Sequence, residues 1–403
     1  MKYSQYKESG IDWIDVIPEH WETKMFKGIS YMKGRIGWQG LKFSEFSDDV
    51  TLPYLITGMN FKDGKIRWDE VYHISEERYN EAPEIQLKDY DILMTKDGTI
   101  GKLLYIDNLP GKASLNSHLL LLRPLLKSYF PKFLYYQLQS SVFFGHIEYY
   151  KYGTTFYGLS QESMGKFITI LPSYSEQTAI AQYLDRKTTA VDKKIEILQQ
   201  KIETYKKLRK AIINKAVTKG LDDKETNKKW KLQRVKDLVV ICNGKDYKEV
   251  QSDDGKYDVF GSGGAFEKST EFIYDKPSVL LGRKGTIDKP ILVEKPFWAV
   301  DTMFYSKMKA KTDAKFFYYF TTTIEFGFYE YGSALPSITQ NDLNRILLYF
   351  PQIKEQRQIA EYLDQKTATI DKIVENLQTQ IATLQHLRKV LINDAVTGKI
   401  KVV

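Results

Sequence analysis

Residues 172–219 read PSYSEQTAIAQYLDRKTTAVDKKIEILQQKIETYKKLRKAIINKAVTK, and residues 351–398 read PQIKEQRQIAEYLDQKTATIDKIVENLQTQIATLQHLRKVLINDAVTG. Aligned without a gap, at a constant offset of 179 residues (351 minus 172), the two stretches are identical at about half of their positions. Agreement of this extent at one offset indicates an internal repeat rather than chance. The chain is therefore expected to contain one structural unit in two copies.

Both copies are predicted to be long helices. They are rich in Ala, Leu, Lys, Glu and Gln and contain no internal glycine or proline, which favours an uninterrupted helix. Ser173 and Glu176 have the spacing of a capping box at the start of the first copy. The second copy has Gln352 at the first of these positions, which predicts a weaker cap.

An apolar seam runs along each predicted helix, with residues alternately four and three apart. Its members are Val191, Ile195, Leu198, Ile202 and Tyr205 in the first copy and Ile370, Val374, Leu377, Ile381 and Leu384 in the second. Two such seams in one chain favour an antiparallel coiled coil between the helices, and the alternative is that each helix packs on its own domain. A forty-residue helix spans roughly 60 Å, which suggests a rod that holds other parts apart.

The repeat continues more weakly into the regions upstream of each helix. Residues 92–100 resemble residues 279–287, residues 133–136 resemble residues 316–319, and Trp21 and Trp230 each follow a polar stretch. Short apolar runs predict strands at 92–94, 119–122, 279–281 and 303–305, and helices are predicted at 131–140 and 314–321.

We therefore expect an α+β protein with an internal pseudo-two-fold repeat, in which two α/β domains are separated by the two long helices. The expected order is an N-terminal segment at 1–20, a first domain at 21–171, a helical region at 172–220, a second domain at 221–350 and a helical region at 351–403.

The composition is that of a basic, aromatic-rich protein. A formal net charge of +8 favours a polyanionic partner, although surplus lysine can also simply keep a surface soluble. The 28 tyrosines and 21 phenylalanines suit a nucleic-acid surface where they alternate with cations, but most of them must fill cores.

Two glycine-containing turns carry cations at corresponding places in the two domains. They are Lys96-Asp97-Gly98-Thr99-Ile100-Gly101-Lys102 and Arg283-Lys284-Gly285-Thr286. Backbone N–H groups, a hydroxyl and a cation in one turn can hold a phosphate, whereas the alternative for each is an ordinary hairpin with a solvated lysine. Weaker candidates are Tyr152 and Thr154 in the first domain and Tyr331 and Ser333 in the second.

The sequence carries no catalytic signature, so we expect no catalytic residue, no bound cofactor and no metal site. It contains neither the Pro-Pro-aromatic motif of DNA amino-methyltransferases nor a P-loop, and its five histidines show no metal-ligand spacing. One cysteine, Cys242, excludes an internal disulfide. With no apolar run long enough for a membrane span and no signal peptide, the protein is expected to be cytoplasmic.

The repeated motifs Glu-Gln, Ile-Ala, Tyr-Leu-Asp, Lys-Thr, Asp-Lys, Leu-Arg-Lys and Ala-Val-Thr resemble the conserved regions of the specificity subunits of Type I restriction-modification systems. The opening residues 9–14 and 17–21 are similar to the N-terminal signature of that family. After the first helix, however, Leu221-Asp222-Asp223-Lys224 does not repeat this signature, so the start of the second domain is not marked.

The resemblance implies a non-catalytic DNA-binding protein. Each domain would be a target-recognition domain that reads one half of a bipartite, asymmetric site in double-stranded DNA. The helices would set the spacer and bind two modification subunits, which would carry S-adenosylmethionine. Separate restriction subunits would carry ATP hydrolysis and cleavage. A coiled-coil adaptor that does not bind DNA would explain the helices but not the paired basic domains, and a transcription regulator would be expected to contain a helix-turn-helix.

Overall fold

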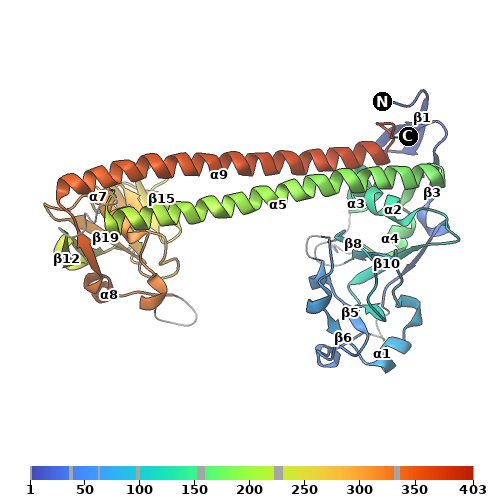
Figure 1. Ribbon diagram of the computed structural model, residues 1–403, viewed down its shortest axis with the longest axis horizontal. Coiled ribbons are helices and arrows are strands. Elements are labelled where there is room, and N and C mark those ends of the chain that lie inside the picture. Colours follow the sequence, from blue (N-terminus) through green and yellow to red (C-terminus); the bar gives the residue numbers. More distant parts are fainter. Residues whose placement is uncertain are drawn as a thin grey trace. The chain divides into compact units, whose positions relative to one another are not determined.

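The computed structural model describes residues 2–35, 40–61, 64–96, 100–151, 159–221, 230–330 and 336–402. The chain divides into two compact units (Figure 1): Met1–Glu196 with Gln380–Val403, and Ile197–Thr379. The division passes through the two long helices, α5 (Tyr174–Lys219) and α9 (Ile353–Val396). Each unit therefore contains one domain and part of each long helix.

The two predicted helices are confirmed. They contain 46 and 44 residues, which corresponds to roughly 65–70 Å each. Ser173 caps α5, since its Oγ accepts a hydrogen bond from the N–H of Glu176 at 3.3 Å. At the start of α9 the backbone carbonyl of Gln352 has this role instead, accepting from the N–H of Glu355 at 2.9 Å. Gly220 and Gly398, with φ of 84° and 74°, follow the two helix ends, where a left-handed residue commonly terminates a helix.

The domain of the first unit is built on a four-stranded antiparallel sheet. Its order is β4 (Ser30–Lys33), β10 (Leu119–Pro124), β7 (Ile92–Thr95) and β8 (Leu103–Tyr105). A three-stranded sheet has the order β6 (Tyr72–His73), β5 (Tyr54–Ile56) and β9 (Ala113–Leu115), with β5 and β9 parallel. Strands β3 (Glu22–Met25) and β11 (Ile168–Leu171) form a third pair, and β1 (Tyr6–Ile11) and β2 (Ile14–Pro18) a fourth.

The domain of the second unit repeats the topology of the first three of these sheets, whereas the β1–β2 pair has no counterpart among its described residues. Its four-stranded sheet has the order β13 (Val239–Asn243), β19 (Met303–Met308), β16 (Ser278–Gly282) and β17 (Ile291–Val293). Its three-stranded sheet has the order β15 (Gly264–Ser269), β14 (Tyr257–Gly261) and β18 (Phe297–Ala299), again with one parallel pair, and β12 (Lys231–Arg234) pairs with β20 (Leu347–Phe350). The four predicted strands lie in β7, β10, β16 and β19, so the repeat includes the domains.

Short helices complete both domains. They are α1 (Glu76–Asn80), α2 (Pro131–Gln137), α3 (Ser141–Lys151) and α4 (Gln161–Gly165) in the first unit, and α6 (Val235–Leu238), α7 (Ala314–Thr321) and α8 (Gln340–Arg345) in the second. The helix predicted at 314–321 is confirmed. The one predicted at 131–140 ends at Gln137, because Leu138–Ser140 make the turn into α3.

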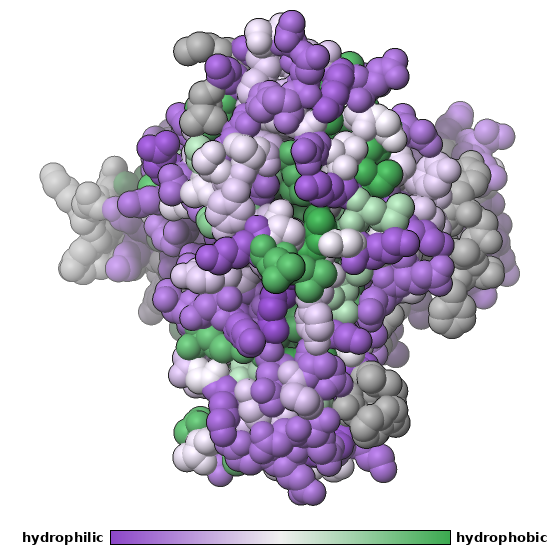
Figure 2. All heavy atoms as spheres, turned by 90° about the vertical axis from the view of Figure 1, so that its right-hand side faces the viewer, coloured by the Kyte–Doolittle hydropathy of each residue, from purple (hydrophilic) through white to green (hydrophobic). Residues whose placement is uncertain are grey.

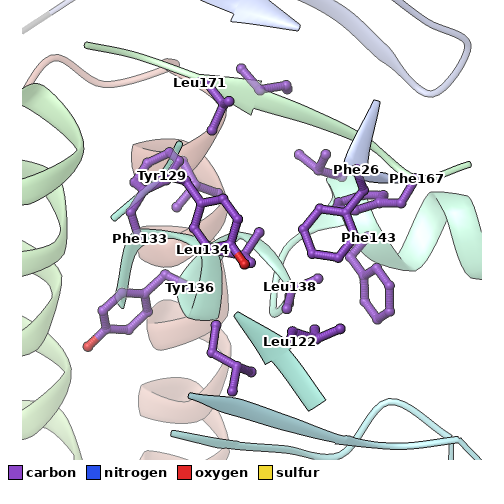
Figure 3. Packing of buried hydrophobic residues seen from close by; sticks show 14 of the residues in the cluster. Phe26, Leu122, Tyr129, Phe133, Leu134, Tyr136, Leu138, Phe143, Phe167 and Leu171 are labelled. Atoms are coloured by element: carbon purple, nitrogen blue, oxygen red, sulfur yellow. The ribbon is translucent and has the colours of Figure 1, made fainter. Parts of the chain in front are cut away.

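The face of the first unit seen in Figure 2 is mostly hydrophilic, and buried apolar side chains of this unit gather beside the long helices (Figure 3). One core cluster joins Leu184 near the start of α5 to Ile392 near the end of α9. In the second unit the corresponding cluster joins Ile213 near the end of α5 to Leu363 near the start of α9. The helices are therefore antiparallel within each unit, and they pack on the domains as well as on each other. None of the described helices is long and apolar enough to cross a membrane.

Candidate nucleic-acid interface

The cationic turn of the first unit lies at one end of the four-stranded sheet. Lys96 directly follows β7, donates its N–H to the carbonyl of His118 at 3.1 Å and accepts a hydrogen bond from the N–H of Leu159 at 2.9 Å. Lys102 donates its N–H to Thr95 Oγ1 at 3.0 Å. Lys102 is exposed and Lys96 half-buried, and no carboxylate of the described residues pairs with either ammonium group. Both cations are thus placed to meet an anion from solvent.

The second unit has a cationic turn at the same place. Arg283 follows β16, donates its N–H to Thr302 at 2.8 Å and accepts from the N–H of Ile338 at 3.1 Å. Its guanidinium lies 5.9 Å from the centre of the Phe304 ring, and Lys284 beside it is exposed. Gly285 has a φ of +82°, which suits glycine. Its N–H donates to the carbonyl of Pro336 at 2.9 Å, and the half-buried Thr286 follows it.

The same backbone contact is made to the cationic turn of each unit. Leu159 and Ile338 are separated by the repeat offset of 179 residues, and each donates its N–H to the cationic residue of its turn. Leu159 follows the segment that contains Tyr152 and Thr154, and Ile338 follows shortly after the one that contains Tyr331 and Ser333. Those four residues, together with Gly98 and Thr99, lie outside the described part of the chain. The contacts with the cationic turns are thus made by described residues that come after these segments, Leu159 and Ile338.

A neighbouring strand adds residues that the sequence reading did not select. Gly34 follows β4 and Gly244 follows β13, and a Cβ at these positions would lie 3.0 Å from the Leu119 carbonyl oxygen and 2.0 Å from that of Val300. Lys245, next to the second glycine, is exposed and adds a cation to the edge. In the sequence, a glycine followed by a cation occurs at matching positions of both domains, Gly34-Arg35 and Gly244-Lys245, and this pattern could have pointed to these residues.

Arg35, the counterpart of Lys245, has a different role. Its side chain is buried and donates to the Leu115 carbonyl at 3.0 Å and to Ser114 Oγ at 3.1 Å, so it braces β9. Burial lowers the pKa of this guanidinium to about 10, which leaves it charged at neutral pH. Among the described residues of the first unit's edge, the half-buried Lys96 and the exposed Lys102 of the turn therefore supply the accessible cations.

The edge of each sheet presents lysine or arginine side chains, which can contact phosphates. The backbone N–H groups of Lys96, Lys102, Arg283 and Gly285 already donate to oxygens of the same domain, so they hold the turns in shape. Within the described segments, no group of three or more His, Cys, Asp or Glu residues could hold a metal ion. The exposed cations at both edges are suited to contact an anion.

The comparison with protein families matches the chain twice, once for each domain. The model of the type I restriction modification DNA specificity domain matches residues 18–206 and again residues 227–383. The chain belongs to this family. Each match covers one domain together with much of the long helix that follows it, so the two specificity domains of the family correspond to the two copies of the repeat.

Individual relatives agree over nearly the whole chain. A Methanocaldococcus jannaschii protein described as a type I restriction enzyme specificity subunit (MjaX) is 25% identical, with 98% of both chains covered. The MjaVIII specificity subunit of the same organism is 24% identical, covering 96% of this chain and 94% of its own.

Two solved structures are similar in fold. A chain from a structure on complex assembly and conformational transition of the type I R-M system gives a TM-score of 0.75 at 14% identity, covering 95% of this chain and 99% of its own. The HsdS subunit from Thermoanaerobacter tengcongensis gives 0.53 at 14% identity, with 99% and 100% covered.

Each specificity domain is fastened to its long helix by the same contact. In the first unit the Tyr136 hydroxyl donates to Asp185 at 2.6 Å and lies 3.1 Å from Thr188 Oγ1. In the second, the Tyr319 hydroxyl donates to Asp364 at 2.7 Å and lies 3.1 Å from Thr367 Oγ1. We call these three-residue sets the first and second latch. Burial raises the pKa of both phenols, so both remain protonated donors at neutral pH.

The glutamine of each Glu-Gln motif makes a second repeated contact. Gln177 accepts a hydrogen bond from the N–H of Phe130 at 2.8 Å, and Gln356 accepts one from the N–H of Asp313 at 2.8 Å. Both glutamines are buried, and both donate back to the proline that precedes their helix, at 2.9 Å. The motifs found in the sequence therefore position the helix that follows the central strand, α2 or α7, on the long helix.

The predicted seam residues are sheltered in both helices. Leu198, Ile202 and Ile370 are buried, and the other seven are half-buried: Val191, Ile195, Tyr205, Val374, Leu377, Ile381 and Leu384. Reciprocal ion pairs flank the seam. In the second unit Arg209 Nε lies 2.9 Å from Asp371, and in the first Arg388 Nε lies 2.9 Å from Asp192. Both arginines and both aspartates are equivalent under the repeat offset of 179 residues, so each unit contains one such ion pair.

Proposed function

We propose that this type I specificity subunit reads a bipartite, asymmetric DNA site, with one half contacted by each specificity domain. The observation that carries the proposal is the duplicated cationic turn: Lys96 and Arg283 follow equivalent strands and have equivalent hydrogen bonds. Two similar but non-identical edges would contact phosphates alike and read different bases, because sequence is read by side chains at base edges while phosphate contacts only position the protein.

The long helices, in this proposal, set the spacer between the half-sites and bind two modification subunits. Methyl transfer from S-adenosylmethionine is assigned to those partners, and ATP-driven cleavage to separate restriction subunits. The chain itself takes no part in bond chemistry. The latches and glutamine contacts support this division of roles between the domains and the helices, because they fix a specificity domain to a long helix in each copy of the repeat.

The first test measures DNA affinity of the isolated chain against salt concentration. Lys96→Ala and Arg283→Ala should each reduce the slope of log affinity against log salt by about one unit, equally on cognate and unrelated duplexes. Lys206→Ala, at an exposed α5 residue that pairs with Glu203, serves as the matched control and should leave the slope unchanged. Slopes identical to that of the unaltered chain in both variants would remove the turns from the DNA interface.

The second test concerns the shape of the site. Sequencing of methylated positions after assembly with modification subunits should give two short sequences separated by a constant unread spacer. One continuous recognition sequence would contradict the division of reading between two domains.

A further inference from the structure

A pocket opens on the first unit at the end of its four-stranded sheet opposite the cationic turn. Its volume is about 480 Å³, and its lining includes Tyr90, Tyr105, Arg123, Lys127, Tyr129 and Tyr174. We call it the tyrosine pocket. Asp91 just before β7 and Arg123 near the end of β10 lie beside it, whereas Lys96 and His118 lie at the other ends of these two antiparallel strands. The tyrosine pocket therefore does not belong to the proposed DNA edge.

The turn formed by residues 125–128 lies at the rim of the tyrosine pocket, and its backbone conformation is unusual. Leu125 donates its N–H to the Ile29 carbonyl and accepts from the N–H of Ser128, both at 2.8 Å. Between them, Leu126 and Lys127 have φ of 47° and 57°, left-handed conformations that glycine and asparagine adopt more readily. The Leu126 side chain is fully exposed, so the turn holds an apolar side chain out into solvent.

The second unit contains the same turn in relaxed form. Lys309 donates its N–H to the Leu238 carbonyl at 3.0 Å and accepts from the N–H of Thr312 at 2.9 Å, as Leu125 and Ser128 do. Neither of its central residues, Ala310 and Lys311, has a positive φ. The fold therefore does not require a strained turn or an exposed leucine at this place, and both are particular to the first unit.

Backbone strain in the described chain is concentrated around this pocket. The four non-glycine residues with positive φ are Tyr90, Asn108, Leu126 and Lys127. Tyr90 and Lys127 line the pocket, Leu126 adjoins it, and Asn108 precedes Leu109, whose N–H donates to the pocket residue Asp89 at 2.7 Å. Strained residues gather where a surface is shaped for binding more often than elsewhere.

The charges at the rim favour an acidic occupant. Lys88 and Lys127 are exposed, and among described residues neither forms an ion pair. Asp91 is neutralised by Arg123, from which it accepts two hydrogen bonds at 2.7 Å. Asp89 accepts one from the N–H of Leu109 and keeps its charge, so Lys88 and Lys127 leave the lining with a surplus of one positive charge. Tyr90 and Tyr174, 57% and 46% exposed, offer aromatic surface between these cations.

We propose that the tyrosine pocket docks an apolar side chain flanked by carboxylates, presented by a modification subunit, and that only the first unit has this site. The choice of partner rests on the proposed function. Partly exposed tyrosines around a hollow are typical of the residues that dominate protein interfaces. Its place at the far end of the sheet separates it from the edge assigned to DNA, so the first domain would contact DNA and partner at opposite ends.

The test uses the full-length chain and a matched pair of variants, Leu126→Asp and Ala310→Asp, at equivalent positions of the two turns. Affinity for the purified modification subunit and for cognate duplex is measured for each. Leu126→Asp should weaken subunit binding at least about tenfold, because it replaces an apolar rim contact with a carboxylate that repels the acidic occupant, while Ala310→Asp stays within about twofold. DNA affinity of the isolated chain should be the same for both.

Both positions are exposed, so circular dichroism and melting temperatures should match those of the unaltered chain. If Leu126→Asp melts early, Lys127→Glu provides a second measure, because reversing a rim charge should weaken subunit binding several-fold at low salt.

Equal subunit affinity for both Asp variants would overturn the proposed docking site while leaving the specificity function intact. Loss of DNA affinity in Leu126→Asp, with subunit affinity kept, would overturn it in favour of a nucleic-acid contact. An unaltered chain that binds no modification subunit would overturn both proposals.

Discussion

The buried side chain of His146 shows how the surroundings of a residue set its protonation state. His146 lies among the rings of Phe143, Tyr150 and Phe167, and its Nε2 is 3.0 Å from the Ser163 carbonyl oxygen, so that nitrogen carries the proton. Burial lowers the pKa of this imidazole from its ordinary value of 6.5, because the charged form loses its solvation.

The first unit should therefore lose stability as the pH falls below about 6.5. The unfolded chain binds a proton at His146 before the folded chain does, so protonation favours unfolding and the contribution is fully present only above that pH. Denaturant unfolding between pH 7.5 and 5.5 measures this slope. His146→Gln, which keeps an N–H donor without a titrating ring, should show a shallower slope, and parallel slopes would disprove the assignment.

At the scale of elements, the latches explain why α2 and α7 take equivalent places on the long helices. Each joins a tyrosine on a short helix to an aspartate and a threonine on a long one. They differ in one respect. Lys132 Nζ lies 3.6 Å from Asp185, whereas Lys315 Nζ lies 2.8 Å from Asp364. The second aspartate therefore keeps a close partner even without its tyrosine.

Removing the latch hydroxyls should reveal this difference. Tyr136→Phe should lower the free energy of unfolding by roughly 1.5–3 kcal/mol, the usual range for a hydrogen bond to a charged group. Tyr319→Phe should cost less, because Lys315 still neutralises Asp364. Chemical denaturation of both variants gives the comparison, with Tyr135→Phe, on the residue beside the first latch, as the control. Equal losses in the two latch variants would contradict the compensating role of Lys315.

At the scale of the whole molecule, a domain followed by a long helix occurs twice, and each unit contains part of both helices. The ion pairs Arg209–Asp371 and Arg388–Asp192 flank the seam, but partly exposed pairs contribute only about 0–1 kcal/mol each. Burial of helix ends in the two core clusters is the larger effect. If the helices set the spacer, as proposed, their length should determine it.

Lengthening both long helices tests directly whether their length determines the spacer. Four helix-forming residues inserted before Leu198 and, at the repeat-equivalent position, before Leu377 add about 6 Å of rise and one turn plus roughly 40°. One base pair advances about 3.4 Å and turns about 34–36°. Since each domain must still face its groove, rotation should dominate and the spacer should gain one base pair, with both half-sequences unchanged. Methylation-site sequencing of the assembled variant measures the spacer, and an active variant with the original spacer would exclude a ruler.

The sequence alone determined the repeat, both long helices, their seams and the strands that bear the cationic turns. These features depend on neighbours a few residues apart, so periodicity and composition reveal them. It also placed Lys96 and Arg283 at matching positions. It offered only a repeated glycine–cation pair at Gly34 and Gly244, and did not show their close packing, which depends on the backbone of Leu119 and Val300 far along the chain.

Only the tertiary structure decided which distant residues meet. Leu159 reaches Lys96, and Tyr136 reaches Asp185, because antiparallel strands and crossing helices bring together parts of the chain that share no local pattern. The contrast between Leu126-Lys127 and Ala310-Lys311 is also a tertiary matter. The two turns are anchored by the same hydrogen bonds, yet only one is left-handed, and no periodicity in the sequence records a backbone dihedral.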